Sequence, residues 1–196
     1  MPLLDWLLRK HYEDYAIQST WANLHLNKAE RGLHNRIKKS LELYPCDLLF
    51  VHRDADNQPL DSRIEEIETA LMHIPGLQKP VVHVIPVRMQ EAWLLFDEQA
   101  IRWAAGNENG KRPLKLPSLK SIEHLPDPKE VLNNLLREAS ELNRHRRSHI
   151  PVSLYAQQVA EYIEDFTPLQ QLSAFQHLQA QIKDLVQRNW PETDWK

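Results

Sequence analysis

The sequence predicts an α/β fold, on the evidence of two apolar runs and the helical pattern between them. The runs, Asp47–His52 and Pro80–Val87, are rich in aliphatic residues and indicate strands buried on both faces of a sheet. Between them, apolar residues recur at helical spacing over Asp61–His73, and a Pro-Gly pair ends the pattern. A strand, a helix and a strand within about forty residues form a βαβ unit, whose strands are parallel. We therefore expect a mainly parallel sheet covered by helices.

Two helices and a strand are expected before this unit. Leucines gathered on one face predict a helix over Leu3–His11. A strand is expected over Tyr15–Thr20. A polar helix over Asn27–Leu43 carries an apolar stripe with a spacing of four residues, and Pro45 ends it.

The chain after the unit is expected to be largely helical, with a long loop and a basic turn. Asp127-Pro128 supplies a cap and a first-turn proline for one helix, and Thr167 caps the last. The expected elements are helices over Ala92–Trp103, Lys129–Leu142, Leu154–Ile163 and Pro168–Gln187, a loop over Asn107–Pro128, a basic turn over Asn143–His149 and a tryptophan-bearing tail over Trp190–Lys196. Residues 1–106 would then form an α/β core, 107–128 a loop, and 129–196 a helical region packed on the core.

Composition excludes several classes of protein. The 196 residues carry a net charge of −3, so nucleic acid would have to bind through a local basic patch. One cysteine, Cys46, allows neither an intramolecular disulfide nor a cysteine zinc cluster and suggests a reducing compartment. Four glycines leave no Gly-rich phosphate loop. With no signal peptide and no apolar run long enough to cross a bilayer, we expect a cytoplasmic protein without membrane contact.

Asp54-Ala55-Asp56 follows the first strand and is the main candidate for a site. In an extended chain, alternate side chains point to the same side, so Asp54 and Asp56 would face one point. Two carboxylates that close repel each other unless a cation or a shared proton intervenes, and a hard divalent ion such as Mg2+ suits that place. The alternative is an acidic turn that caps the next helix.

The second strand is also followed by charged residues. Sites in parallel sheets form at the carboxyl ends of strands, so Arg88 and Glu91 are expected beside Arg53 and the two aspartates. Glu91 is either a ligand or general base, or only an acid in the first turn of a helix. Arg53 and Arg88 could each clamp a phosphate, or simply neutralise the aspartates.

Each of the other notable polar and aromatic residues has a purely structural interpretation as well as a functional one. His52 and His83 lie within strands and are expected to be structural. His145 and His149 have the spacing of a zinc pair, but no third ligand is evident and we reject a zinc site there. Seven basic side chains could either contact phosphate or simply carry solvated charge, and the sequence leaves both interpretations open. Two tryptophans are expected to pack in the core or at an interface. The basic residues are Lys111, Arg112, Lys115, Lys120, Arg144, Arg146 and Arg147, and the tryptophans are Trp93 and Trp103.

Four segments together resemble the DUF4276 family of Toprim-like proteins: Arg53-Asp-Ala-Asp56, Pro86–Leu95, Asp127-Pro-Lys-Glu130 and Phe166–Leu172. The resemblance implies a three-layer Toprim-like fold with a helical C-terminal extension. It implies Mg2+ or Mn2+ bound by Asp54 and Asp56, with Glu91 as the family's acid at the next strand end. It also implies phosphodiester chemistry in anti-phage defence, beside a partner ATPase of the AAA or ABC type.

The sequence departs from the family at its start. Toprim-like chains usually open with a strand carrying Val-Glu-Gly, whereas this chain opens in the helix from Pro2 to His11, and its earliest glutamate is Glu13. Three explanations stay open: either Glu91 takes over the role of the missing glutamate, or another chain supplies that carboxylate, or the site has lost its chemistry. Two functions stay open. One is a metal-dependent nuclease or phosphoesterase acting on nucleic acid, with DNA favoured over RNA or a small phosphorylated substrate. The other is a degraded subunit that docks on and regulates an ATPase.

Overall fold

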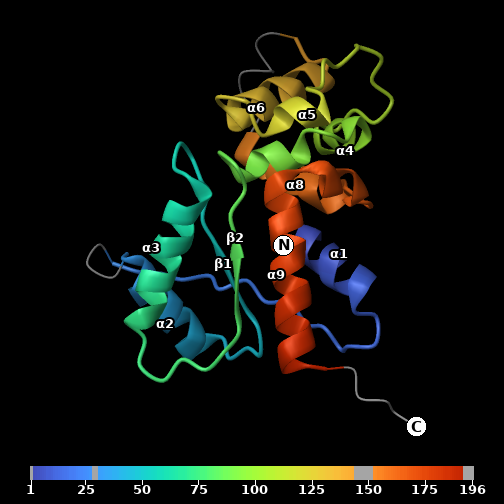
Figure 1. The fold of residues 1–196 in the computed structure, drawn as a ribbon. Helices are drawn as coiled ribbons and strands as arrows, with labels where there is room; N and C mark the ends of the chain where they lie inside the picture. Colours follow the sequence, from blue (N-terminus) through green and yellow to red (C-terminus); the bar gives the residue numbers. More distant parts are fainter. Residues whose placement is uncertain (1, 28–30, 144–151, 192–196) are drawn as a thin grey trace. The chain divides into compact units, whose positions relative to one another are not determined.

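The structure, a computed structural model, describes residues 2–27, 31–143 and 152–191, which form a mixed α/β fold (Figure 1). The expected α/β class is therefore confirmed. The elements of the described chain are α1 (Pro2–His11), α2 (Leu33–Leu43), β1 (Leu49–His52), α3 (Leu60–Met72), β2 (Val81–Val84), the 3-10 helix η2 (Gln90–Leu94), α4 (Glu98–Ala104), α5 (Leu119–Ile122), α6 (Pro128–Ala139), α8 (Val152–Tyr162), the 3-10 helix η3 (Thr167–Gln171) and α9 (Ser173–Asn189).

The chain divides into two compact units. One combines Met1–Ile17 with Pro86–Phe175, and the other combines Gln18–Ile85 with Gln176–Lys196. The boundary between Phe175 and Gln176 falls inside α9. The three segments expected from the sequence follow composition along the chain, whereas these units collect segments distant in sequence; the three-part division stays a prediction.

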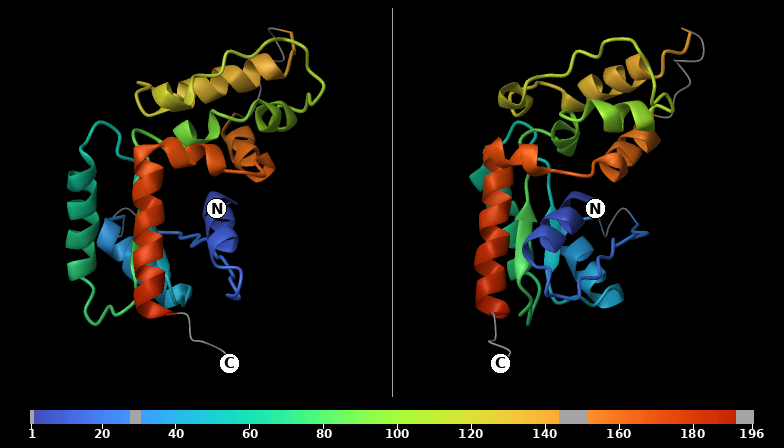
Figure 2. Two further views of the ribbon diagram at one scale, coloured as in Figure 1. Left: turned by 45° about the vertical axis from the view of Figure 1, so that its right-hand side comes forward. Right: turned by 90° about the vertical axis from the view of Figure 1, so that its right-hand side faces the viewer.

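The second unit contains the expected βαβ unit. β1 and β2 pair in parallel, with Leu49 opposite Val81 and His52 opposite Val84, and they are the two strands of the described chain. The apolar face of α3 packs on the sheet through Ile67, which is fully buried. α2 and α3 lie on one side of the strands, and α9 lies on the other (Figures 1 and 2). The core of this side comprises Ile37, Val51, Ala55, Ile67, Ala70 and Ile85.

The first unit is helical, and its core is rich in aromatic rings. Phe166 lies edge-on to Trp6 and to Phe96, with ring centroids 5.7 and 6.3 Å apart. Trp93 lies edge-on to Phe175 at 5.8 Å. Trp93, Phe166 and Phe175 are at most 1% exposed, so these three rings contribute nearly all of their apolar area to the core.

Several expected elements are wrong. The expected strand over Tyr15–Thr20 is irregular backbone, and a short helix, α5, interrupts the expected loop over 107–128. The expected helix over Ala92–Trp103 is broken into η2 and α4, because the Asp97 side chain accepts the Ala100 N–H at 2.9 Å and caps a new helix. Trp93 and Trp103 therefore belong to different helices.

The last expected helix is also broken. Thr167 opens the 3-10 helix η3 rather than capping a long α-helix, and α9 begins at Ser173. The cap expected at Asp127 is confirmed, since its side chain accepts the Glu130 N–H at 2.8 Å. Residues 144–149 of the expected basic turn, with Arg144, Arg146 and Arg147, lie outside the described residues. Among the described helices, none is long and apolar enough to cross a membrane.

Candidate functional site

The backbone after β1 leaves the extended conformation at Asp56. The Arg53 N–H donates to the Val84 carbonyl at 3.0 Å, which continues the ladder one residue beyond β1. Ala55 is then buried, Asp56 has a φ of 53°, and the Gln58 N–H closes a turn on the Ala55 carbonyl at 2.9 Å. Alternation of side chains requires extended backbone, so the argument that aims both aspartates at one point does not extend to Asp56.

Asp54 lies beside a histidine, and Asp56 pairs with an arginine. His52 Nε2 lies 3.3 Å from Asp54 Oδ1, and Arg63 Nη2 lies 3.0 Å from Asp56 Oδ2. Asp54 is 34% exposed and Asp56 is 52% exposed, so solvent reaches both carboxylates. Within the described part of the chain, no group of three or more His, Cys, Asp or Glu side chains is arranged to hold a metal ion.

A network of arginines and a glutamate backs the turn. Glu66 of α3 accepts from Arg53 Nη2 and from Arg63 Nη1, each at 2.7 Å. Burial alone would raise the pKa of the Glu66 carboxyl, but the hydrogen bonds from Arg63 and Arg53 outweigh it and hold the pKa below its usual value. Arg53 is thus bound to a glutamate of α3.

Sequence reasoning did not identify Arg63 and Glu66. They are three residues apart on α3, so they share a helix face, and Arg63 also reaches Asp56. That spacing in the helix after the Asp-Ala-Asp turn is the signal from which the pair could have been found.

Arg88 and Glu91 belong to the other unit. Arg88 follows β2 with a φ of 65°, and Glu91 lies in the first turn of η2. Glu91 Oε1 lies 3.7 Å from Nζ of Lys129, in the first turn of α6, and the glutamate side chain is 21% exposed. The structure therefore brings Arg53, Asp54 and Asp56 together in one turn, whereas their meeting with Arg88 and Glu91 stays a prediction.

Left-handed backbone marks two of the candidate residues. Among the described non-glycine residues, positive φ occurs at Asp56, Arg88 and Glu141. This conformation costs roughly 1–2 kcal/mol for an ordinary L-residue and less for aspartate, and such strain gathers at functional sites. Both turns that follow the paired strands therefore contain one strained candidate residue.

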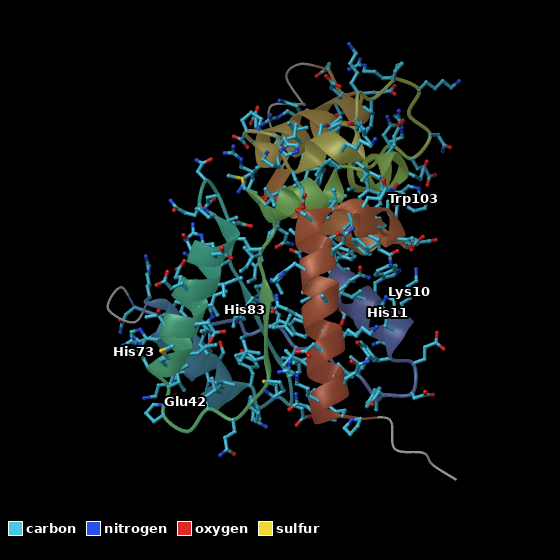
Figure 3. All side chains as sticks on the ribbon, in the orientation of Figure 1. Lys10, His11, Glu42, His73, His83 and Trp103 are labelled. Carbon is cyan, nitrogen blue, oxygen red and sulfur yellow. The ribbon has the colours of Figure 1, made fainter. Side chains whose placement is uncertain are left out.

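Among the remaining residues, His83 and Trp93 have the structural role expected of them, and the choice between phosphate contact and solvated charge stays open for the basic residues. His83, labelled on β2 in Figure 3, is 8% exposed and pairs with Glu68 at 3.1 Å. Trp93 is a core residue, as expected. Lys111, Arg112, Lys115 and Lys120 are exposed, and His145 and His149 lie outside the described residues.

No family model matches this chain, and no curated protein and no solved structure matches it either.

Proposed function

We propose that this chain is a Toprim-like protein that hydrolyses phosphodiester bonds of nucleic acid, with DNA as the favoured substrate, using Mg2+ or Mn2+ held by Asp54 and Asp56. One observation carries the proposal: the acidic turn follows β1 directly, at the carboxyl end of a parallel strand pair. Its strained Asp56 backbone supports the same interpretation.

The donor chemistry fits a hard divalent cation in part. Both aspartates offer carboxylate oxygens to solvent, which are the ligands that Mg2+ prefers. Arg63 already forms an ion pair with Asp56, however, so a cation has to compete with the Arg63 guanidinium for that carboxylate. When bound, the cation would stabilise charge on the phosphate and activate the attacking water.

The arginines and Glu91 would act around the scissile phosphate. Arg53 is held by Glu66, which fixes its guanidinium at the base of the turn and would present its remaining N–H groups to a phosphate oxygen. Arg88 would supply a second phosphate contact. The resemblance to the family assigns to Glu91 the proton of the attacking water.

A second candidate is a non-catalytic subunit that docks on an AAA- or ABC-type ATPase in anti-phage defence. Its supporting observation is that the chain's own Arg63 already neutralises the charge of Asp56. The network through Glu66 would then serve to hold the shape of the turn. An ATPase encoded beside this chain that co-purifies with it would support this function.

The test is cleavage of plasmid DNA and of RNA by purified protein with Mg2+, Mn2+ or EDTA. An Asp54→Asn/Asp56→Asn variant removes both charges with little change in shape. Asp184→Asn is the matched control, because Asp184 also pairs with an arginine, Arg188, at 2.8 Å on the exposed face of α9. Metal-dependent cutting that persists in the control and is lost in the double variant supports the nuclease. A folded wild type that neither cuts nor binds Mn2+ more tightly than the double variant overturns it.

A further inference from the structure

Arg102 of α4 is a buried arginine with one nitrogen that has no partner. Its side chain is 7% exposed, and Nε and Nη2 donate to Glu98 Oε1 at 2.9 and 2.6 Å. Nη2 also donates to the Arg112 carbonyl at 2.6 Å. Nη1 is buried and has no hydrogen-bond partner among the described residues. An unsatisfied buried donor is costly and calls for a physical explanation.

The unpartnered nitrogen lies under a surface loop at Gly110. A Cβ atom on Gly110 would lie 2.7 Å from Arg102 Nη1, 2.6 Å from Asn107 Nδ2 and 3.0 Å from Glu141 Oε1. Asn107 is fixed there, since its Nδ2 donates to the Ala139 carbonyl at 2.8 Å. Two nitrogen donors and a carboxylate oxygen therefore meet around a residue that has no side chain.

Glu141 already places an anion in this loop. Its Oε1 accepts the Arg112 N–H at 2.7 Å. This hydrogen bond, reinforced by one from the Lys111 amide, lowers the pKa of the Glu141 carboxyl. Glu141 reaches the loop with a φ of 50°, directly after Ser140, which caps the C-terminus of α6. Consecutive backbone N–H groups that converge on a carboxylate form an anion-binding concavity.

We propose that Arg102 Nη1 and the backbone amides of Lys111 and Arg112 form a binding site for a phosphate group, which the carboxylate of Glu141 occupies until phosphate displaces it. The planar carboxylate of Glu141 accepts hydrogen bonds from the two amides and leaves Arg102 Nη1 without an acceptor. A phosphate has more acceptor oxygens in a tetrahedral arrangement and can accept from the amides and from the guanidinium together. The exposed side chains of Lys111, Arg112 and Lys115 add positive charge around the loop.

This site goes beyond the proposed function. All its residues lie in the unit that contains α4 and α6, it needs no metal ion, and its ligand is a phosphate group whatever the chemistry at Asp54 and Asp56. The ligand could be a phosphate of a nucleic acid strand or a free phosphate, and these two sources are distinguished by the choice of probe.

The test titrates the full chain with inorganic phosphate and, separately, with a short single-stranded DNA, at constant ionic strength. Amide shifts of residues 110–112 and calorimetric affinity are the readouts. Glu141→Gln removes the competing charge and should bind phosphate about tenfold more tightly, which corresponds to a change of about 1.4 kcal/mol in binding free energy. Arg102→Lys keeps the charge but removes Nη1, and should abolish the gain when combined with Glu141→Gln. Arg188→Gln on α9 is the control for general loss of positive charge.

The outcomes separate the two sources of phosphate and can overturn the site. Tighter binding of the oligonucleotide than of phosphate identifies a nucleic acid strand, and binding of phosphate alone identifies a free ligand. If Glu141→Gln, shown to be folded by circular dichroism, binds neither probe, the site does not exist. The same conclusion follows if Arg102→Lys binds as well as Arg188→Gln.

Discussion

Gln181 of α9 makes, with its side chain alone, both backbone hydrogen bonds that a neighbouring strand would make to His83 of β2. Its Oε1 accepts the His83 N–H at 3.1 Å, and its Nε2 donates to the His83 carbonyl at 3.3 Å. The outer edge of a strand is otherwise a row of unpaired donors and acceptors. The amide of Gln181 therefore closes the edge of β2 at His83, within the unit that contains both residues.

Replacing Gln181 with alanine should destabilise this unit. Two partly buried backbone groups of His83 lose their partners, which we expect to lower the free energy of unfolding by about 1–3 kcal/mol. Urea unfolding and hydrogen exchange of the His83 amide measure the effect, and exchange at that amide should accelerate. Gln187→Ala, on an exposed position of the same helix, is the control and should leave both readouts unchanged. Equal exchange at His83 in the two variants would show that the amide contributes nothing.

The stability of the same unit should fall on mild acidification because of His83. Burial lowers the pKa of His83 from its ordinary value of 6.5, His177 lowers it further, and Glu68 opposes the shift. Between the folded pKa and the ordinary value, the unfolded chain binds more protons, so stability is lost as the pH falls below about 6.5. Urea unfolding at pH 7.5 and at pH 5 measures this loss. His83→Gln should reduce the difference between the two pH values, and an unchanged difference would remove His83 as its source.

The local sequence pattern was sufficient to predict the βαβ unit but not to predict where the later helices begin and end. The apolar runs of β1 and β2 and the stripe of α3 are properties of adjacent residues, so the sequence predicts them and their parallel pairing. The break at Asp97 also has a local cause, since an aspartate three residues before Ala100 is a readable cap. The start of α9 has no such local cause, because the residue that caps it is Glu123, fifty residues away in the sequence.

The candidate site was likewise predictable only in part. Asp54 and Asp56 follow a strand and could be identified directly. The pairing of Asp56 with Arg63 depends on the left-handed turn at Asp56, and the Asn57-Gln58-Pro59 sequence after it indicates a turn without fixing its backbone angles.

Glu123, the residue that follows α5, should determine where α9 begins. Its Oε2 accepts from the Ser173 N–H at 3.2 Å and from the Ser173 hydroxyl at 2.9 Å, and its Oε1 accepts the Ala174 N–H at 3.1 Å. A carboxylate at a helix N-terminus both satisfies free amides and interacts favourably with the helix dipole. Glu123→Ala should lower the midpoint of thermal unfolding, at a cost of about 1–2 kcal/mol. Glu161→Ala, at an exposed position of α8, serves as the control, and an equal midpoint for both would argue against the cap.

Glu66 should make the Asp54–Asp56 turn sensitive to acid. Its pKa is held below its usual value, so the stabilisation is present above that value and is lost as the pH falls through the folded pKa. Because the Glu66 side chain is 33% exposed, solvent screening limits the effect to about 1 kcal/mol or less. Unfolding midpoints between pH 6 and pH 3 should fall more steeply in the wild type than in Glu66→Gln. Parallel curves would show that the network adds no pH dependence.

Arg63 should compete with metal at Asp56, which gives a direct measure of whether that aspartate is a ligand. Its guanidinium lies 3.0 Å from Asp56 Oδ2, and a divalent ion bound there has to displace it. Arg63→Gln releases the carboxylate while Arg53 still pairs with Glu66, so Mn2+ should bind about tenfold more tightly. Electron paramagnetic resonance of free Mn2+ measures the affinity.

Arg188→Gln, which breaks another arginine–aspartate pair, should not change the Mn2+ affinity. Adding Asp56→Asn to Arg63→Gln should cancel the gain. Mn2+ affinity that is the same in the wild type, in Arg63→Gln and in the double variant would show that Asp56 is not a metal ligand.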